Sequence, residues 1–168
     1  LSLHDALPIS VWGNKGPTVV YVEQSIGAVT LVTQIGSVLP LLGSSTGLVF
    51  NTFLAANETA ELRESESTRL SARQLKEVDL HIKQIRSTGV HQIHGLLMAG
   101  VNAVSSPIFA VGNKLAGVLT VVGSASVFTA EVQDSAARQL LTTAQAISDR
   151  MGGSQPVAGK PAPTGERD

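Results

Sequence analysis

The amino-acid sequence predicts an α+β domain in which helices pack on the faces of a mostly antiparallel sheet. Short β-branched runs come first, segments with helical periodicity follow, and two further β-branched runs precede a last helical segment. Strands and helices that occur in separate groups are typical of this class, whereas strict alternation predicts a parallel sheet. With 168 residues and 43% hydrophobic content, the chain is long enough for one domain with a single core.

The segment 100–123 has the strongest strand signals, and we expect the rest of the chain to pack against it. Val101–Phe109 and Leu115–Val122 have the length and the β-branched content of strands, and a Gly-Asn pair between them tolerates a positive φ. Pro107 donates no backbone hydrogen bond, so we expect it at a bulge or at an edge that faces away from a partner strand. These features predict a buried hairpin.

The first strands are expected near the start of the chain. Segment 1–9 does not begin with Met and resembles translated adaptor sequence, so we expect it to be foreign or disordered. Ser10–Trp12 and Thr18–Glu23 flank a Gly-rich turn and predict a hairpin. Apolar and polar residues alternate along Ala28–Ile35, which indicates a third strand.

Three helices are expected in the middle of the chain. Segment 44–55 is apolar on most of its circumference and predicts a buried helix that a serine caps. Asn57 is expected to cap a short polar helix that runs through Glu66. Ser71 has Gln74 three residues later, which is the spacing of a capping box, and Gly89 ends that third helix on the surface of the sheet.

The remaining elements complete the expected domain, which spans residues 10–152. Val90–Leu97 is expected to be a strand that leads into the central hairpin. Thr129 is expected to cap the last helix, whose apolar positions share one face and which ends at a Gly-Gly pair. Residues 153–168 are rich in Pro, Gly and charge, and we expect them to be a disordered tail.

Composition excludes several classes of function. The net charge of −1 provides no large basic face, so we do not expect the chain to bind nucleic acid unaided. The absence of cysteine excludes disulfides, thiolate metal sites and thiol nucleophiles, and it is consistent with a cytoplasmic location. No apolar run approaches the roughly 18 residues that a membrane helix needs.

One motif indicates an alternative function. Residues 43–47 match the G-x-S-x-G nucleophile elbow, so a small serine hydrolase using Ser45 is the alternative interpretation. That elbow requires a strong strand directly before the serine, and segment 39–42 is short and interrupted by a proline. We therefore favour a helix N-cap or an anion-binding turn and assign no catalytic residue.

The histidines are assigned no chemistry. His91 and His94 lie three apart on a predicted strand, so their side chains would point to opposite faces and could not share a metal ion. We expect surface or edge histidines, with the mouth of a pocket as the alternative location. We place His81 on the solvent side of its helix, and no metal or cofactor is expected.

In series, several motifs resemble the C-terminal effector-binding domain of IclR-type transcriptional regulators. They are Trp12–Asn14 with Gly16–Val20, Ile35–Leu42 with Ser45–Gly47, Arg86–Gly89, and Gly100–Phe109. The resemblance implies a GAF-like, profilin-like domain that binds a small organic acid, assembles as a homodimer or tetramer, and is not an enzyme. It also implies that promoter DNA is bound only through a winged helix-turn-helix domain that is missing from this sequence. A GAF-like interaction module without a ligand remains an alternative.

The resemblance also implies an effector site between the sheet and the Ser45 helix. Its lining would be Ala28, Leu31, Leu39, Ser45, Thr46, Gly47, Ile93, Ala103, Thr120 and Val122. Independently, unpartnered amides of residues 45–47 and the helix dipole would stabilise a carboxylate by roughly 0.3 to 2 kcal/mol, and Gly47 would let a ligand approach the backbone. Because this lining has few polar groups, we expect a larger, partly apolar or aromatic acid instead of a small keto acid.

Overall fold

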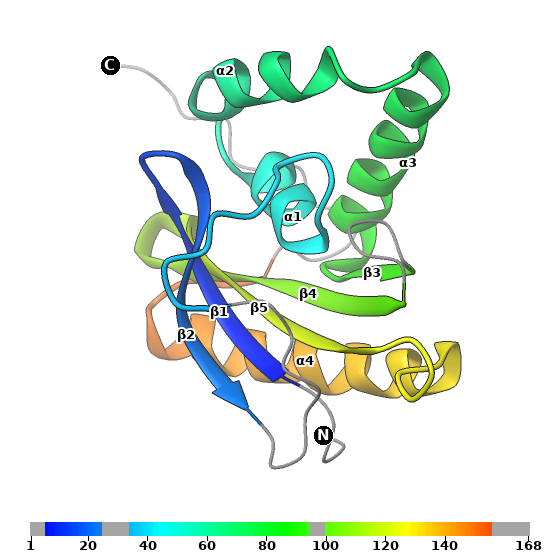
Figure 1. Ribbon diagram of the computed structural model, residues 1–168. Helices are drawn as coiled ribbons and strands as arrows, with labels where there is room; N and C mark the ends of the chain where they lie inside the picture. The colour runs from blue at the N-terminus through cyan, green and yellow to red at the C-terminus, as the bar shows by residue number, and fades with distance from the viewer. Residues whose placement is uncertain (1–5, 25–33, 95–99, 156–168) are drawn as a thin grey trace.

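The computed structural model describes residues 6–24, 34–94 and 100–155, and its central layer is a five-stranded antiparallel sheet with the order β2-β1-β5-β4-β3. The strands are β1 Ala6–Gly13, β2 Gly16–Gln24, β3 His91–His94, β4 Val101–Ala110 and β5 Lys114–Ser124. The helices α1 Ser45–Phe53, α2 Ala56–Ser67 and α3 Ala72–Thr88 lie on one side of the sheet, and α4 Ala130–Arg150 lies on the other (Figure 1). The predicted α+β class is confirmed.

The predicted hairpin, β4 with β5, forms the middle of the sheet. Its pairs run from Val101 opposite Ser124 to Ala110 opposite Lys114, and β1 and β3 flank it on either side. The turn contains Gly112, with a φ of 73°, and the next residue also has a positive φ, which the Gly-Asn pair accommodates. β3 pairs with β4 only as far as Ser105, so Pro107 lies beyond the part of β4 that β3 covers.

One expectation about a strand boundary was wrong. β1 begins at Ala6, so residues 6–9, to which we assigned no structure, form half of that strand and pair with β2 and β5. Residues 153–155 of the expected tail are described, and Ser154 donates its backbone N–H to Asn113 Oδ1 over 3.0 Å. Residues 28–33 of the expected third strand, 95–97 of the expected strand before β4, and 156–168 lie outside the described residues.

Most helix ends agree with the capping predictions. Ser44 is the N-cap of α1, Ser71 and Gln74 form the capping box of α3, and Gly89 ends α3 with a φ of 71°. The start of α2 was wrong, since its N-cap is Ala55 and Asn57 lies inside the helix. The Glu58 carboxylate accepts the Ala55 backbone N–H over 3.1 Å, and this bond ties down the amide of a residue that has no capping side chain.

The sheet separates two apolar clusters. Side chains of β5 alternate between the two faces of the sheet and contribute to both clusters. Val118 is buried in the cluster under α1 and α3, whereas Leu119 and Val121 are buried in the cluster under α4. Successive side chains of a strand point to opposite faces, so one strand supplies both layers. None of the helices in the described ranges is long and apolar enough to cross a membrane.

Close backbone packing seats α1 on the loop that precedes it. A Cβ added to Gly47 would collide with the carbonyl oxygen of Pro40 and would also lie within 2.7 Å of the Leu41 Cα. Real Cβ atoms do not approach main-chain atoms so closely, and the main chain of a buried loop cannot yield easily. Glycine is therefore required at position 47 so that helix and loop can touch.

We predict that Gly47→Ala destabilises the domain by more than about 2 kcal/mol, because the added methyl group overpacks a site surrounded by backbone. Gly112→Asn is the control, since its Cβ would have no neighbour within 4 Å and Asn tolerates the left-handed region. Urea unfolding followed by circular dichroism measures both variants. Equal stabilities for the two would contradict the packing argument.

Candidate functional site

The start of α1 faces the central strands and is organised by Ser44. The Ser44 hydroxyl accepts the Gly47 backbone N–H over 2.8 Å and donates to the carbonyl oxygen of Pro40 over 2.7 Å. The third amide of the helix is therefore capped by the protein itself, which corrects the expectation that all three were free. Within the described parts of the chain, the amides of Ser45 and Thr46 have no hydrogen-bond acceptor.

Buried hydroxyl groups join α1 to the central hairpin. Thr46 Oγ1 lies 2.8 Å from Thr120 Oγ1 on β5, which in turn lies 2.9 Å from Ser105 Oγ on β4. All three residues are buried. A buried hydroxyl without a partner costs roughly 1–3 kcal/mol, so these bonds favour one seating of the helix on the sheet.

A second chain of polar contacts begins at Ser45. Its Oγ lies 2.9 Å from Nδ1 of His91 on β3, and Nε2 of His91 lies 3.0 Å from Nδ1 of His81 on α3. His91 is 0% exposed, and burial, with the charge of His81 as a smaller cause, lowers its pKa from 6.5 to about 3. The His91 imidazole is therefore neutral near pH 7, and only one of its two nitrogens carries a proton.

The histidine expectations were partly wrong. His91 lies on the edge strand β3 as expected, but its side chain is buried, because α1 and α3 cover the face of β3 from which it projects. His81 is partly buried with its ring edge-to-face against His91, at 4.8 Å between ring centroids, instead of facing solvent. Periodicity within α3 could not reveal this contact, because it depends on where α3 crosses β3.

Strand register arranges the remaining predicted site residues in rows. The row below the start of α1 is polar and consists of the directly paired residues His91, Ser105 and Thr120. The next row on the same face is apolar and consists of Ile93, Ala103 and Val122, which Ala6 extends onto β1. Residues two apart on a strand share a face, so the apolar row continues directly from the polar one.

The structure brings together six of the ten predicted lining residues. They are Ser45, Thr46, Ile93, Ala103, Thr120 and Val122. We expected Gly47 to belong to this group, but it does not. The backbone of residues 40–41 occupies the space beside Gly47 that we assigned to a ligand. Leu39 is only partly buried and lies in the loop before α1, while Ala28 and Leu31 lie outside the described residues.

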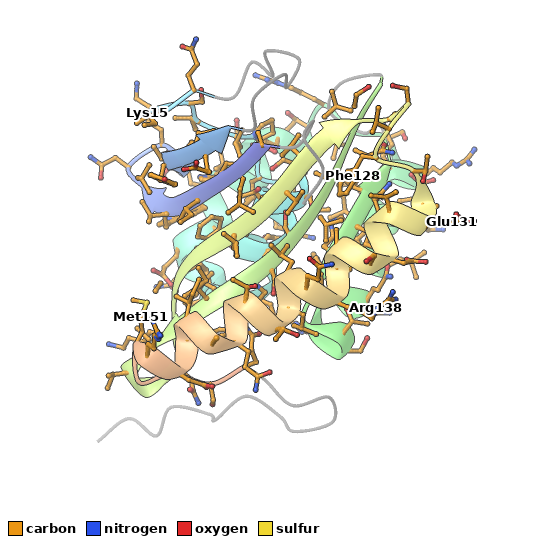
Figure 2. The ribbon with its side chains drawn as sticks, turned by 90° about the horizontal axis from the view of Figure 1, so that it is seen from below. Lys15, Phe128, Glu131, Arg138 and Met151 are labelled. Carbon is orange, nitrogen blue, oxygen red and sulfur yellow. The ribbon has the colours of Figure 1, made fainter. Side chains whose placement is uncertain are left out.

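Two cavities lined by described residues lie elsewhere. One, of about 390 Å³, lies on the opposite face of the sheet, between α4 and the side chains of Leu7, Leu119 and Val121. Figure 2 shows that face, with α4 running across the strands from Glu131 to Met151. The other, of about 400 Å³, lies between α2 and the loop before α1 and includes Leu39. Neither includes Ser45 or Thr46.

Sequence reasoning missed the residue that holds the loop before α1. Glu66, on α2, accepts the backbone N–H groups of Leu41 and Leu42 over 2.8 and 2.7 Å. Charge-assisted bonds of this length are roughly twice as strong as neutral ones. No local signal could have revealed a contact across more than twenty residues, since Glu66 reads as one of many charges on a solvated helix.

Within the described residues, Ser45 has a histidine partner but lacks the exposure and the preceding strand that a catalytic serine requires. Ser45 and His91 are at hydrogen-bond distance, as in a nucleophile with its base, but both are buried between α1 and the sheet. Residues 41–43 form a turn and not the strand that a nucleophile elbow needs. In residues 6–24, 34–94 and 100–155, no three His, Asp or Glu side chains are placed to hold a metal ion.

The comparisons place this antiparallel α+β fold among the C-terminal domains of bacterial transcription regulators. Residues 7–149 match the family described as the bacterial transcriptional regulator IclR C-terminal domain. The chain belongs to this family. A comparison with curated proteins found no match.

Solved structures agree with this assignment. HmgR from Pseudomonas aeruginosa is 54% identical, with a TM-score of 0.81 over 90% of this chain and 61% of that one. A putative IclR regulator from Silicibacter and the repressor BlcR from Agobacterium tumefaciens are 21% and 18% identical, with TM-scores of 0.75 and 0.72. They cover 90% and 88% of this chain, and 61% and 60% of theirs. The chain thus spans about three fifths of these relatives.

We predict that Glu66→Gln lowers the free energy of unfolding by about 1–3 kcal/mol, because an amide can accept only one of the two N–H groups and presents a donor to the other. Glu64→Gln removes the same charge from an exposed position of α2 and is the matched control. Chemical denaturation compares the two. A loss that is the same in both variants would show that charge, and not the loop contact, is responsible.

We also predict a pH effect that depends on His91. Since its pKa is lower in the folded state, the unfolded chain binds more protons below pH 6.5, and stability is lost as pH falls from 6.5 toward 3. Relative to wild type, His91→Gln should remove about 1.4 kcal/mol of this loss per pH unit. Thermal unfolding of both proteins at pH 8, 7, 6, 5 and 4 measures this difference. Above pH 7 the stabilities of wild type and His91→Gln should change with pH in parallel.

Proposed function

We propose that this chain is the effector-sensing part of an IclR-type regulator and that a partly apolar or aromatic organic acid binds at the start of α1. The observation that supports it best is the junction of two rows on one sheet face. Polar groups lie under the helix start, and the apolar row of Ile93, Ala103 and Val122 continues from them. A ligand with a charged end and an apolar body matches both parts.

The charged end is assigned to the first turn of α1. The amides of Ser45 and Thr46 point out of the helix start, where the helix dipole favours negative charge by roughly 0.3–2 kcal/mol. The hydroxyls of the same residues lie beside these amides and already contact His91 and Thr120. A carboxylate there would accept from two backbone donors without the cost of an unpaired buried charge.

The apolar body is assigned to the second row. Ala103 and Val122 are directly paired and only partly buried, and Ala103 packs at the edge of the cluster under α1, so apolar surface remains in the middle of that row. A flat ring covering two such residues gains about 25 cal/mol per Å² of apolar surface removed from water. The family resemblance adds Ala28 and Leu31 to the proposed lining, and Leu39 and Gly47 support it only through the loop before α1.

The binding of a ligand can affect transcription only in the whole regulator. We propose that a winged helix-turn-helix domain precedes this part of the protein and binds promoter DNA, and that the regulator assembles as a homodimer or tetramer. Support comes from family membership and from relatives whose chains extend well beyond the matched region. Ligand binding at α1 would then change how the DNA-binding parts are held relative to one another.

Calorimetric titration with phenylacetate, phenylacetamide, pyruvate and glyoxylate tests the proposal. We expect phenylacetate to bind most tightly, because it alone combines the carboxylate with an apolar ring. Ala103→Leu should weaken its binding at least tenfold by filling the row, whereas Val111→Leu, at an exposed turn, should not. Tightest binding by glyoxylate, or equal binding of phenylacetamide and phenylacetate, would contradict the proposal.

A further inference from the structure

We propose that His81 is a positioning residue: through His91 it determines whether the Ser45 hydroxyl donates or accepts a hydrogen bond toward a ligand at the start of α1. The inference rests on the proposed function for the location of the ligand. It depends on one continuous chain of contacts, from His81 on α3, through His91 on β3, to Ser45 on α1.

Each nitrogen of His91 has one partner, and the partners differ in what they can do. Nδ1 faces a hydroxyl, which can donate or accept, and Nε2 faces the Nδ1 of His81, which donates in one tautomer and accepts in the other. Because His91 is fully buried and neutral near pH 7, its single proton must lie on one side or the other. The hydrogen bonds that link His81, His91 and Ser45 therefore have two possible arrangements.

In the first arrangement the proton of His91 is on Nε2 and is donated to His81. Nδ1 then accepts the Ser45 O–H, and the Ser45 oxygen presents only lone pairs to a ligand. In the second arrangement the proton is on Nδ1 and is donated to Ser45, while Nε2 accepts N–H from His81. The Ser45 hydrogen then turns away, toward a ligand or toward the His91 carbonyl oxygen, which lies 3.5 Å from Oγ.

The two arrangements contain the same number of protons. For the form of the protein in which both imidazoles are neutral, Ser45 has one hydroxyl proton and each of His91 and His81 has one ring proton in either arrangement. To pass from the first to the second, the Ser45 hydroxyl proton moves to Nδ1 of His91, and the Nε2 proton of His91 moves to Nδ1 of His81. His81, which is partly exposed, releases its Nε2 proton to water, and Ser45 Oγ takes up one proton from water in return, so no oxidant or reductant is required.

A carboxylate has no donor, so it stabilises the arrangement in which Ser45 donates. The contact to the His91 carbonyl at 3.5 Å is a poor alternative for that hydrogen, and a ligand oxygen would be a better acceptor. His81 permits this arrangement because its Nδ1 can become a donor. A residue that only accepts at position 81 would hold the proton on Nε2 and leave Ser45 unable to donate.

Nitrogen NMR of histidine-labelled protein tests the inference without any ligand, by showing which His91 nitrogen bears the proton in wild type and in His81→Glu. We expect the acceptor-only carboxylate to place it on Nε2. In wild type, saturating phenylacetate should place it on Nδ1. An unchanged His91 tautomer in His81→Glu and on binding of phenylacetate would overturn the inference, and the proposed function would still stand.

Affinity provides the second measurement. His81→Glu should weaken phenylacetate binding about tenfold more than Gln84→Glu, which adds the same charge at an exposed position of α3. In a Ser45→Ala background the two substitutions should have equal effects, because the hydroxyl that His81 controls is gone. A difference that persists in that background would overturn the inference. If phenylacetate and the other acids fail to bind wild type, the proposed function fails, and the ligand-free spectra still decide the role of His81.

Discussion

The structure depends on the hydrogen bonds that hold the first turn of α1 against the sheet. Apolar contacts alone would allow a helix to slide or rotate over a sheet at little cost, because they are not directional. The buried hydroxyl of Thr46 is satisfied only when Thr120 lies opposite it, and Ser45 only when His91 does. Since β3, β4 and β5 must be in register for both pairs to form, the helix and the strands fix one another.

Local chemistry was enough to predict most of the fold. The central hairpin, the capping box of α3 and the glycine that ends α3 all follow from residues close together in the chain. The errors occurred where the deciding contact is tertiary. Ala6 is in a strand because β2 and β5 pair with it on both sides, and α2 begins before Asn57 because the Glu58 side chain holds the Ala55 amide.

The candidate site was predictable in part for the same reason. Ile93, Ala103 and Val122 share a row because paired strands and a period of two leave them no other arrangement. His91 could not be assigned from sequence, since its burial and its lowered pKa result from helices that pack over β3. At position 47 the need for glycine was recognised, yet the close neighbour is the loop backbone and not a ligand.

The alternation in β5 has a consequence for how this domain can change over evolutionary time. From Val118 to Val121, neighbouring positions belong to different cores, one beneath α1 and one beneath α4, whereas Leu115 and Ala116, on the other side of a bulge in β5, have the opposite parity. Inserting or deleting a single residue between Val118 and Val121 would exchange the two sets of side chains, so that both layers would fail together. We therefore expect changes in length only in the 111–113 turn or at the bulge, where an extra residue is already accommodated.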